Sequence, residues 1–192
     1  MLALSAIFVS MCSLYLAHNS SSAMERLVKA SSWPFIQLES GNTGEDRVTP
    51  DLAFIVSNAG TGPARVHSFD LLVDGQPVEQ SNVLVRLLQA CCDDVYTAET
   101  AEHENPYEVL GVIYTRPVAP TLIAPNDEVV AMGWPRTETN ERLWQAFDQA
   151  RQEGRITTRA CYCSVFDECW RVESGELPVQ QANACEAALE ER

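Results

Sequence analysis

The ten residues CYCSVFDECW, from Cys161 to Trp170, contain three of the seven cysteines of the 192-residue chain. Strand-like runs lie on both sides of their centre. If Phe166 and Asp167 form the tip of a hairpin, Cys163 and Cys169 come near each other across the two strands and could bond there. We therefore expect an antiparallel β-hairpin near the C-terminus, closed by a disulfide.

Six cysteines lie outside the apolar N-terminus, namely Cys91, Cys92, Cys161, Cys163, Cys169 and Cys185. An even number suits a disulfide framework in an oxidising compartment, although six cysteines allow 15 complete pairings. On an extended strand Cys161 and Cys163 lie about 6.6 Å apart, at the upper limit for a bond, so each is expected to bond elsewhere. Cys161 could then reach Cys185. Cys91 and Cys92 are left to pair with each other through a vicinal ring or to stay free.

The same cysteines could instead bind a metal ion. Cys161, Cys163, Cys169 and Cys185 would provide four thiolates, but structural zinc sites usually place the first two cysteines two to four residues apart. A thioredoxin-like redox site needs C-x-x-C, which the sequence lacks. We predict disulfides and no cofactor, and we keep a metal- or thiol-dependent enzyme or sensor at these four cysteines as the alternative.

Strand-like alternation begins after Trp33 and continues to residue 173. Apolar and small polar side chains alternate over 52–58, and the run 65–73 ends in Asp74-Gly75, a dipeptide typical of tight hairpin turns because glycine accepts a positive φ. Further strands are expected at 34–39, 109–114, 121–124, 128–132, 156–165 and 169–173. The pattern predicts a mainly β fold, an antiparallel Ig-like β-sandwich.

Two short helices are expected beside the sandwich. Apolar residues recur at helical spacing from Leu84 to Cys91, and the acidic segment 93–106 that follows has no such pattern and is expected to be a loop. The second helix covers 140–153. Asn140 can cap its N-terminus and Gly154 can end it.

The N-terminus has a different composition from the rest of the chain. Residues 1–17, MLALSAIFVSMCSLYLA, carry no charged side chain. Their number is close to the lower limit of the roughly 17–25 residues that span a bilayer, so we expect a transmembrane helix that anchors the chain. Residues 18–32 are expected to form a polar stalk, 33–173 the sandwich and 174–192 a polar tail.

Charge and motifs exclude several functions. The 27 acidic and 13 basic side chains give a net charge of −14, which repels phosphate backbones, so we expect no nucleic-acid partner. The chain lacks G-x-S-x-G, P-loop and H-E-x-x-H motifs. One of its three histidines, His67, falls in the run 65–73 and is expected to face the core. We therefore expect a protein that is not an enzyme.

Three motifs resemble those of a group of uncharacterised bacterial membrane-anchored Ig-like proteins. They are Trp33-Pro34-Phe35, the bend N-x-G-x-G-P-A from Asn58 to Ala64, and C-Y-C-S-V-F-x-x-C-W from Cys161 to Trp170. The resemblance covers most of 33–172 and implies an extracytoplasmic, membrane-tethered β-sandwich. We accordingly expect a single-pass protein of the bacterial inner membrane. Its periplasmic domain would be a non-catalytic binding or assembly module for a protein partner.

Overall fold

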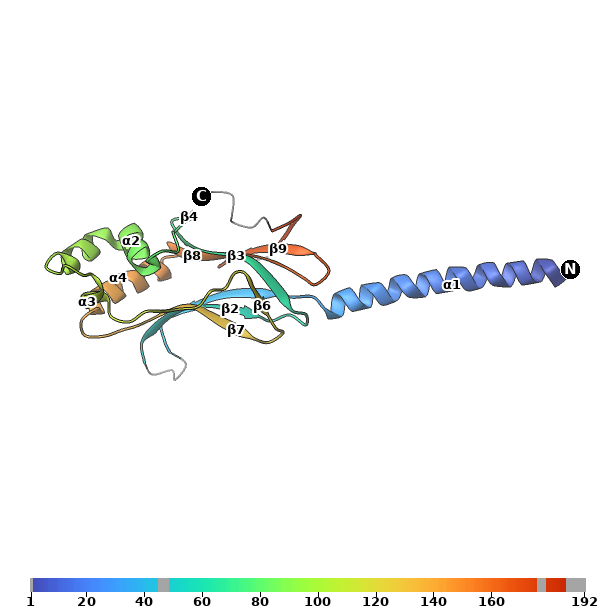
Figure 1. Ribbon diagram of the computed structural model, residues 1–192, viewed down its shortest axis with the longest axis horizontal. Coiled ribbons are helices and arrows are strands. Elements are labelled where there is room, and N and C mark those ends of the chain that lie inside the picture. Colours follow the sequence, from blue (N-terminus) through green and yellow to red (C-terminus); the bar gives the residue numbers. More distant parts are fainter. Residues whose placement is uncertain (1, 45–48, 176–178, 186–192) are drawn as a thin grey trace.

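Two antiparallel sheets pack against each other to form the body of the protein, and one long helix projects from its end (Figure 1). The computed structural model describes residues 2–44, 49–175 and 179–185, with side chains from residue 10 onward. The mainly β sandwich that the alternating pattern predicts is therefore present.

The first sheet has the strand order β1-β2-β7-β5, and the second has the order β10-β9-β8-β3-β4 with β6 also paired to β3. The bounds of the first sheet are β1 Ile36–Gly41, β2 Asp51–Asn58, β7 Glu128–Pro135 and β5 Tyr114–Thr115. Those of the second are β3 Ala64–Val73, β4 Gln76–Pro77, β6 Thr121–Ile123, β8 Ile156–Cys163, β9 Cys169–Glu173 and β10 Gln180–Ala182. The tail thus contributes β10, an edge strand that the sequence did not reveal.

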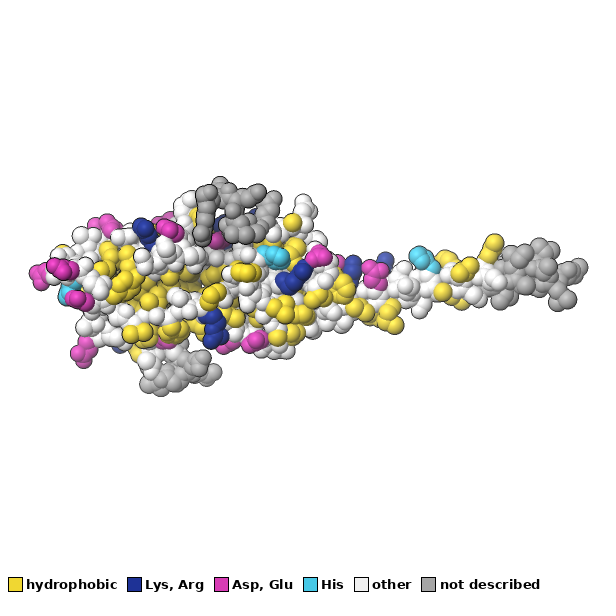
Figure 2. Space-filling view, in the orientation of Figure 1, with side chains coloured by type: hydrophobic (Ala, Val, Ile, Leu, Met, Phe, Trp, Pro, Cys, Tyr) yellow, Lys and Arg dark blue, Asp and Glu magenta, His cyan; other side chains and the backbone are white. Residues whose placement is uncertain are grey.

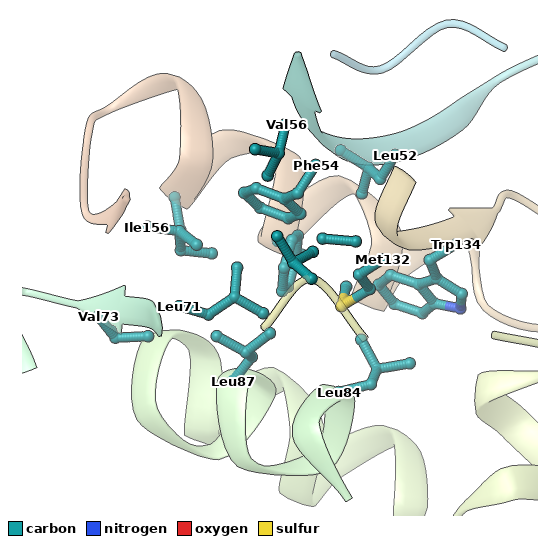
Figure 3. Packing of buried hydrophobic residues seen from close by; sticks show 14 of the residues in the cluster. Leu52, Phe54, Val56, Leu71, Val73, Leu84, Leu87, Met132, Trp134 and Ile156 are labelled. Atoms are coloured by element: carbon teal, nitrogen blue, oxygen red, sulfur yellow. The ribbon is translucent and has the colours of Figure 1, made fainter. Parts of the chain in front are cut away.

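The core lies between the sheets and under the helices. On β2 the side chains of Leu52, Phe54 and Val56 are fully buried, as the alternation predicts. Figure 3 shows them facing side chains of the opposite sheet and of neighbouring helices. Phe54 and Trp134 both pack edge-on against Phe147, with ring centroids 6.3 and 5.8 Å away. Burying each such side chain stabilises the fold by roughly 1.5–3 kcal/mol.

The prediction that His67 faces the core is wrong, because His67 lies in a β-bulge on β3. Val66 pairs with Tyr162 of β8, but the next β8 residue, Cys161, pairs with Ser68. His67 is the extra residue, and it is half-buried rather than part of the core. A bulge shifts the two-residue alternation by one position. The residues that face the core are therefore even-numbered on one side of the bulge and odd-numbered on the other.

The N-terminal segment forms α1, Leu2–Ser31, a single helix that includes most of the expected stalk. Its described side chains are almost all exposed. Across the part of the chain that the structure describes, no helix combines the length and apolar character needed to cross a membrane. The predicted anchor, 1–17, falls largely on residues 1–9, whose side chains lie outside the described residues.

Two predictions for the segment of the chain between β4 and β5 are wrong. The helix α2, Val83–Thr100, continues through much of the predicted acidic loop, because Tyr96 is buried and Glu99 forms an ion pair with Arg142. The run 109–114, predicted to be a strand, begins inside the helical turn α3, Tyr107–Leu110, and only its end enters β5. A short apolar run has no period long enough to separate a strand from a buried helical turn.

The helix α4, Glu141–Gln152, is the one predicted at 140–153, and Gly154 follows it with a φ of 75°, as expected of a glycine after a helix. Asn140 does not cap α4 with its side chain. Its Oδ1 accepts from the backbone N–H of Thr137, 2.7 Å away, and its Nδ2 donates to the carbonyls of Leu110 and Pro135. Asn140 therefore joins α3 to β7.

The buried carboxylate of Asp148 links α4 to the first sheet. Its oxygens accept hydrogen bonds from Asn42, Arg151 and Gln152, and Arg151 also faces Ser40 at the end of β1. Burial alone would raise the pKa of Asp148, but these hydrogen bonds together hold its pKa below the ordinary value. A carboxyl with a lowered folded-state pKa stabilises the fold above its unfolded-state pKa of about 4 and loses that contribution as the pH falls through the folded-state pKa.

We expect Asp148→Asn to lower the free energy of unfolding at pH 7 and to make it depend less on pH below about 4, because the variant has no carboxylate to protonate. Urea denaturation at pH 7 and at pH 3 measures both effects. Asp94→Asn, at an exposed aspartate of α2, is the matched control and should change neither. A pH dependence equal to that of the unmodified protein would contradict the assignment.

Candidate functional site

The β8–β9 hairpin, the bend between β2 and β3, and the base of α1 meet at one end of the body (Figure 1). Lys29 of α1 lies 3.4 Å from Glu168 in the hairpin turn. The carbonyl of Trp33, just after α1, accepts from the backbone N–H groups of Thr61 and Gly62 in the bend. The hairpin therefore contacts the last turns of α1, and the bend contacts the chain that follows α1.

The hairpin has the geometry that its sequence predicts. Cys163 and Cys169 are register partners on β8 and β9, with Cα atoms 4.0 Å apart, and they form a disulfide. At the tip, Asp167 has a φ of 60° and its carboxylate pairs with Arg65 of β3. The backbone N–H of Ser164 donates to the carbonyl of Glu168 at 2.8 Å. The turn is therefore fixed both by its own backbone and by the neighbouring strand.

A second disulfide joins Cys161 of β8 to Cys185, with Cα atoms 5.6 Å apart. It lies beside the short strand β10, which pairs with β9 through Gln180 to Ala182. The described part of the tail is therefore held to the sheet by backbone pairing and by a covalent bond. These are the two pairs that the hairpin geometry suggested, and the third disulfide, Cys91–Cys92, lies in α2.

The sulfurs of the two disulfides are close together. The Sγ atoms of Cys163 and Cys185 are 3.7 Å apart, and those of Cys163, Cys169 and Cys185 all lie within 4.8 Å of one another. Sulfur binds metal ions as a thiolate, so this cluster could hold a metal only after both disulfides were reduced.

Aromatic rings cover the hairpin on the side that faces α1. Trp170 of β9 stacks on Tyr162 of β8 with ring centroids 5.6 Å apart, and Trp33 meets Trp170 edge-on at 6.5 Å. Tyr162 is fully buried. Burial raises the pKa of its hydroxyl. These contacts account for the aromatic residues as packing around the hairpin.

Asn58 is the polar centre of this end and is 1% exposed. Its Oδ1 accepts from the backbone N–H groups of Phe35 at 3.1 Å and Gly60 at 3.0 Å. Its Nδ2 donates to the carbonyls of Gly62 at 2.8 Å and Ile123 at 3.1 Å. One side chain thus joins the start of β1, the bend and the end of β6.

The two glycines of the bend allow the chain after α1 to pass close by. A Cβ on Gly62 would lie 1.9 Å from the carbonyl oxygen of Ser32, and a Cβ on Gly60 would lie 2.3 Å from the amide nitrogen of Phe35. Heavy atoms cannot approach that closely, so a side chain at either position would displace the backbone of 32–35. In the sequence this bend is one of the three motifs of the resemblance, and its close approach to 32–35 was not predicted.

The three histidines, which the sequence analysis considered as possible catalytic bases, lie on separate parts of the chain. Among the described residues, His18 lies on α1, His67 at the bulge of β3, and His103 after α2, where its Nδ1 is 3.1 Å from a carboxylate oxygen of Glu108.

No protein-family model, curated protein or solved structure matches this chain.

Replacing Asn58 with alanine should lower the free energy of unfolding by at least about 3 kcal/mol, because several buried backbone groups would lose their only described side-chain partner. Thermal and urea denaturation test this. Asn183→Ala, at an exposed asparagine next to β10, should leave the stability unchanged. A loss of less than about 1 kcal/mol would show that Asn58 does not organise this end.

Gly62→Ala and Gly41→Ala form a matched pair. A Cβ on Gly41 meets no atom within 4 Å, whereas one on Gly62 collides with Ser32. We expect Gly62→Ala to cost about 2 kcal/mol or more and to loosen the base of α1, while Gly41→Ala stays within about 0.5 kcal/mol of the unmodified protein. Melting temperature and limited proteolysis after Lys29 are the measurements. Equal behaviour of the two variants would contradict the close approach.

Proposed function

We propose that the protein is a membrane-anchored, extracytoplasmic β-sandwich that acts as a non-catalytic binding or assembly module. The observation that carries this proposal is the joint between α1 and the body, in which Asn58, the bend and the disulfide-bonded hairpin hold the base of the helix. A connection of this kind holds a domain at a defined distance from the point at which its helix is attached.

The sequence before the joint supports attachment to a membrane. Residues 1–17 carry no charged side chain. The rest of α1, 18–31, would then act as a helical spacer of about 20 Å at 1.5 Å per residue. The pair between Lys29, the only lysine of the chain, and Glu168 fixes the spacer to the hairpin. Glu168 accordingly raises the pKa of Lys29.

The disulfides support an oxidising compartment, and together with the apolar N-terminus they favour the periplasmic side of a bacterial inner membrane. Six of the seven cysteines are bonded and only the exposed Cys12 of α1 is free. Cytoplasmic thiols are normally kept reduced. The bonded cysteines all lie after α1 and the free one lies within it, as expected of a domain exported beyond its anchor.

The strand order supports an Ig-like sandwich. The longer strands in chain order are β1, β2, β3, β7, β8 and β9, and they divide into the sheets β1-β2-β7 and β9-β8-β3. Ig domains divide seven strands in a similar way, with the first, second, fourth and fifth in one sheet and the third, sixth and seventh in the other, and the short strand β5 beside β7 takes the place of the fourth. Such domains are common carriers of binding surfaces, although the fold alone does not assign a function.

A protein is the partner class that the surface favours. Large apolar side chains are exposed on or beside the short edge strands β5 and β6, including Val112 at 76% and Leu122 at 62% exposure. Figure 2 shows hydrophobic side chains gathered between α2 and β7 on one face. Exposed apolar groups beside short sheet edges suit a protein interface, whereas the net charge of −14 opposes binding to nucleic acid.

The topology is tested with two reporters fused after Arg192 in a bacterial host. We expect alkaline phosphatase, which requires export, to be active, and a fluorescent protein that folds only in the cytoplasm to be dark. The full chain should sediment with membranes, and deletion of residues 2–17 should abolish that association. A bright cytoplasmic reporter beside an inactive phosphatase would reject the proposal.

The sulfur cluster favours a second candidate, a metal- or thiol-dependent enzyme or sensor that uses Cys161, Cys163, Cys169 and Cys185. The separation of no more than 4.8 Å among three of these sulfurs is compatible with a shared metal ion. Stoichiometric zinc in the full chain purified without reductant would support this candidate. Three disulfides in the metal-free protein would reject it.

A further inference from the structure

The disulfide between the adjacent residues Cys91 and Cys92 lies inside α2 and coincides with a break in the helix. Cys92 has a φ of −144° and a ψ of 36°, whereas a regular α-helix has values near −63° and −42°. The residues on both sides continue as helix. The break is thus confined to the bonded pair.

A neighbouring side chain stabilises the broken form. Arg155, just before β8, donates from Nη1 to the carbonyl of Cys91 at 3.0 Å. Its Nε and Nη2 donate to the carboxylate of Asp74 in the β3–β4 turn, at 3.0 and 2.8 Å. In an unbroken helix the Cys91 carbonyl bonds to the N–H of Val95. Insertion of a side chain at a helical carbonyl is a common cause of a kink.

The bonded pair is open to reagents. Cys91 and Cys92 are half-buried and line an open pocket of about 360 Å³ together with Gln149 of α4 and Glu153 just after it. By contrast, the Cys163–Cys169 bond is buried at both ends, and the Cys161–Cys185 bond is buried at Cys161 and half-buried at Cys185; Cys161, Cys163 and Cys169 are only 3–6% exposed. Thiol–disulfide exchange requires a thiolate to reach a sulfur, so the Cys91–Cys92 bond should react first.

The helix beyond the break carries contacts with the rest of the body. Tyr96 is buried, and Glu99 pairs with Arg142 of α4. If Cys92 adopted helical dihedral angles, the part of α2 after it would turn about the helix axis relative to the part before it. The state of one covalent bond is thereby coupled to the position of Tyr96 and Glu99 against α4.

We propose that Cys91–Cys92 is a reducible site whose oxidation state sets the shape of α2, and that the reagent it meets is a dithiol, either a small molecule or a dithiol protein. A thiolate of the dithiol attacks one sulfur, and the Cys91–Cys92 bond breaks to give a mixed disulfide and one cysteine thiolate. The second thiol of the reagent then displaces the other cysteine. The protein gains two electrons and two protons, and the dithiol becomes a disulfide. This inference does not depend on membrane attachment.

The first test is a dithiothreitol titration of the full chain, followed by alkylation and peptide mapping. We expect Cys91 and Cys92 to be alkylated at a concentration at least tenfold lower than the concentration needed for Cys161, Cys163, Cys169 and Cys185. Simultaneous alkylation of all six, or earlier alkylation of the hairpin cysteines, would overturn the proposal.

The second test is amide hydrogen exchange of residues 92–100 in the oxidised and the selectively reduced full chain. We expect exchange to slow by about tenfold on reduction, because the break is replaced by continuous helix, while α1 and the hairpin stay unchanged. The double variant Cys91→Ser and Cys92→Ser should behave like the reduced protein and no longer respond to dithiol. Unchanged or faster exchange in the reduced unmodified chain would overturn the proposal, whether or not the double variant folds.

Arg155→Gln removes the side chain that holds the broken form, so the dithiothreitol concentration for half-reduction should fall two- to threefold. Arg159→Gln, which removes a half-buried ion pair with Asp70 on the same sheet, is the matched control and should leave that concentration unchanged. An equal response of the two variants would show that the Cys91 carbonyl contact has no part in the switch.

Discussion

The structure depends on the buried side chain of Asn58. Its amide joins Phe35, at the start of β1, to Ile123, at the end of β6, and it also holds the bend that leads into β3. A buried amide whose donors and acceptors are all matched specifies one arrangement of the backbone, because any other arrangement leaves polar groups unpaired. The same arrangement brings Gly62 against Ser32, so the constraint that closes the sandwich also positions the helix.

The disulfides act on the same end of the molecule by a different physical route. Closing chain segments 6 and 24 residues long restricts the unfolded chain, and a native disulfide typically contributes about 2–4 kcal/mol. Their second effect is local, because the Cys161–Cys185 bond ties the described part of the tail to β8, next to the pairing of β10 with β9. Hydrogen bonding by Asn58 fixes one side of the helix base, and the bonded hairpin fixes the other through Glu168.

Sequence reasoning predicted the features that depend on near neighbours. The alternation of β2, the turn at Gly75 and the meeting of Cys163 with Cys169 follow from strand period and turn chemistry. It missed features set by distant partners. The second half of α2 has a weak helical pattern, and the burial of its Tyr96 in the core is not evident from neighbouring residues. The role of Asn58 beyond its bend was missed because two of its four partners, Phe35 and Ile123, lie 23 and 65 residues away. The bulge at His67 leaves no mark in the local sequence.

The cysteine pairing underlies both the structure at the base of α1 and the switch proposed in α2, and an intact mass tests it. The full chain is produced in an oxidising compartment, alkylated while unfolded without reductant, and weighed beside a metal analysis of the same sample. We expect a single alkyl group, on Cys12, and a mass about 6 Da below that of the fully reduced chain carrying the same one alkyl group, because three disulfides remove six hydrogens. Alkylation of Cys161, Cys163, Cys169 and Cys185, with stoichiometric zinc, would contradict it.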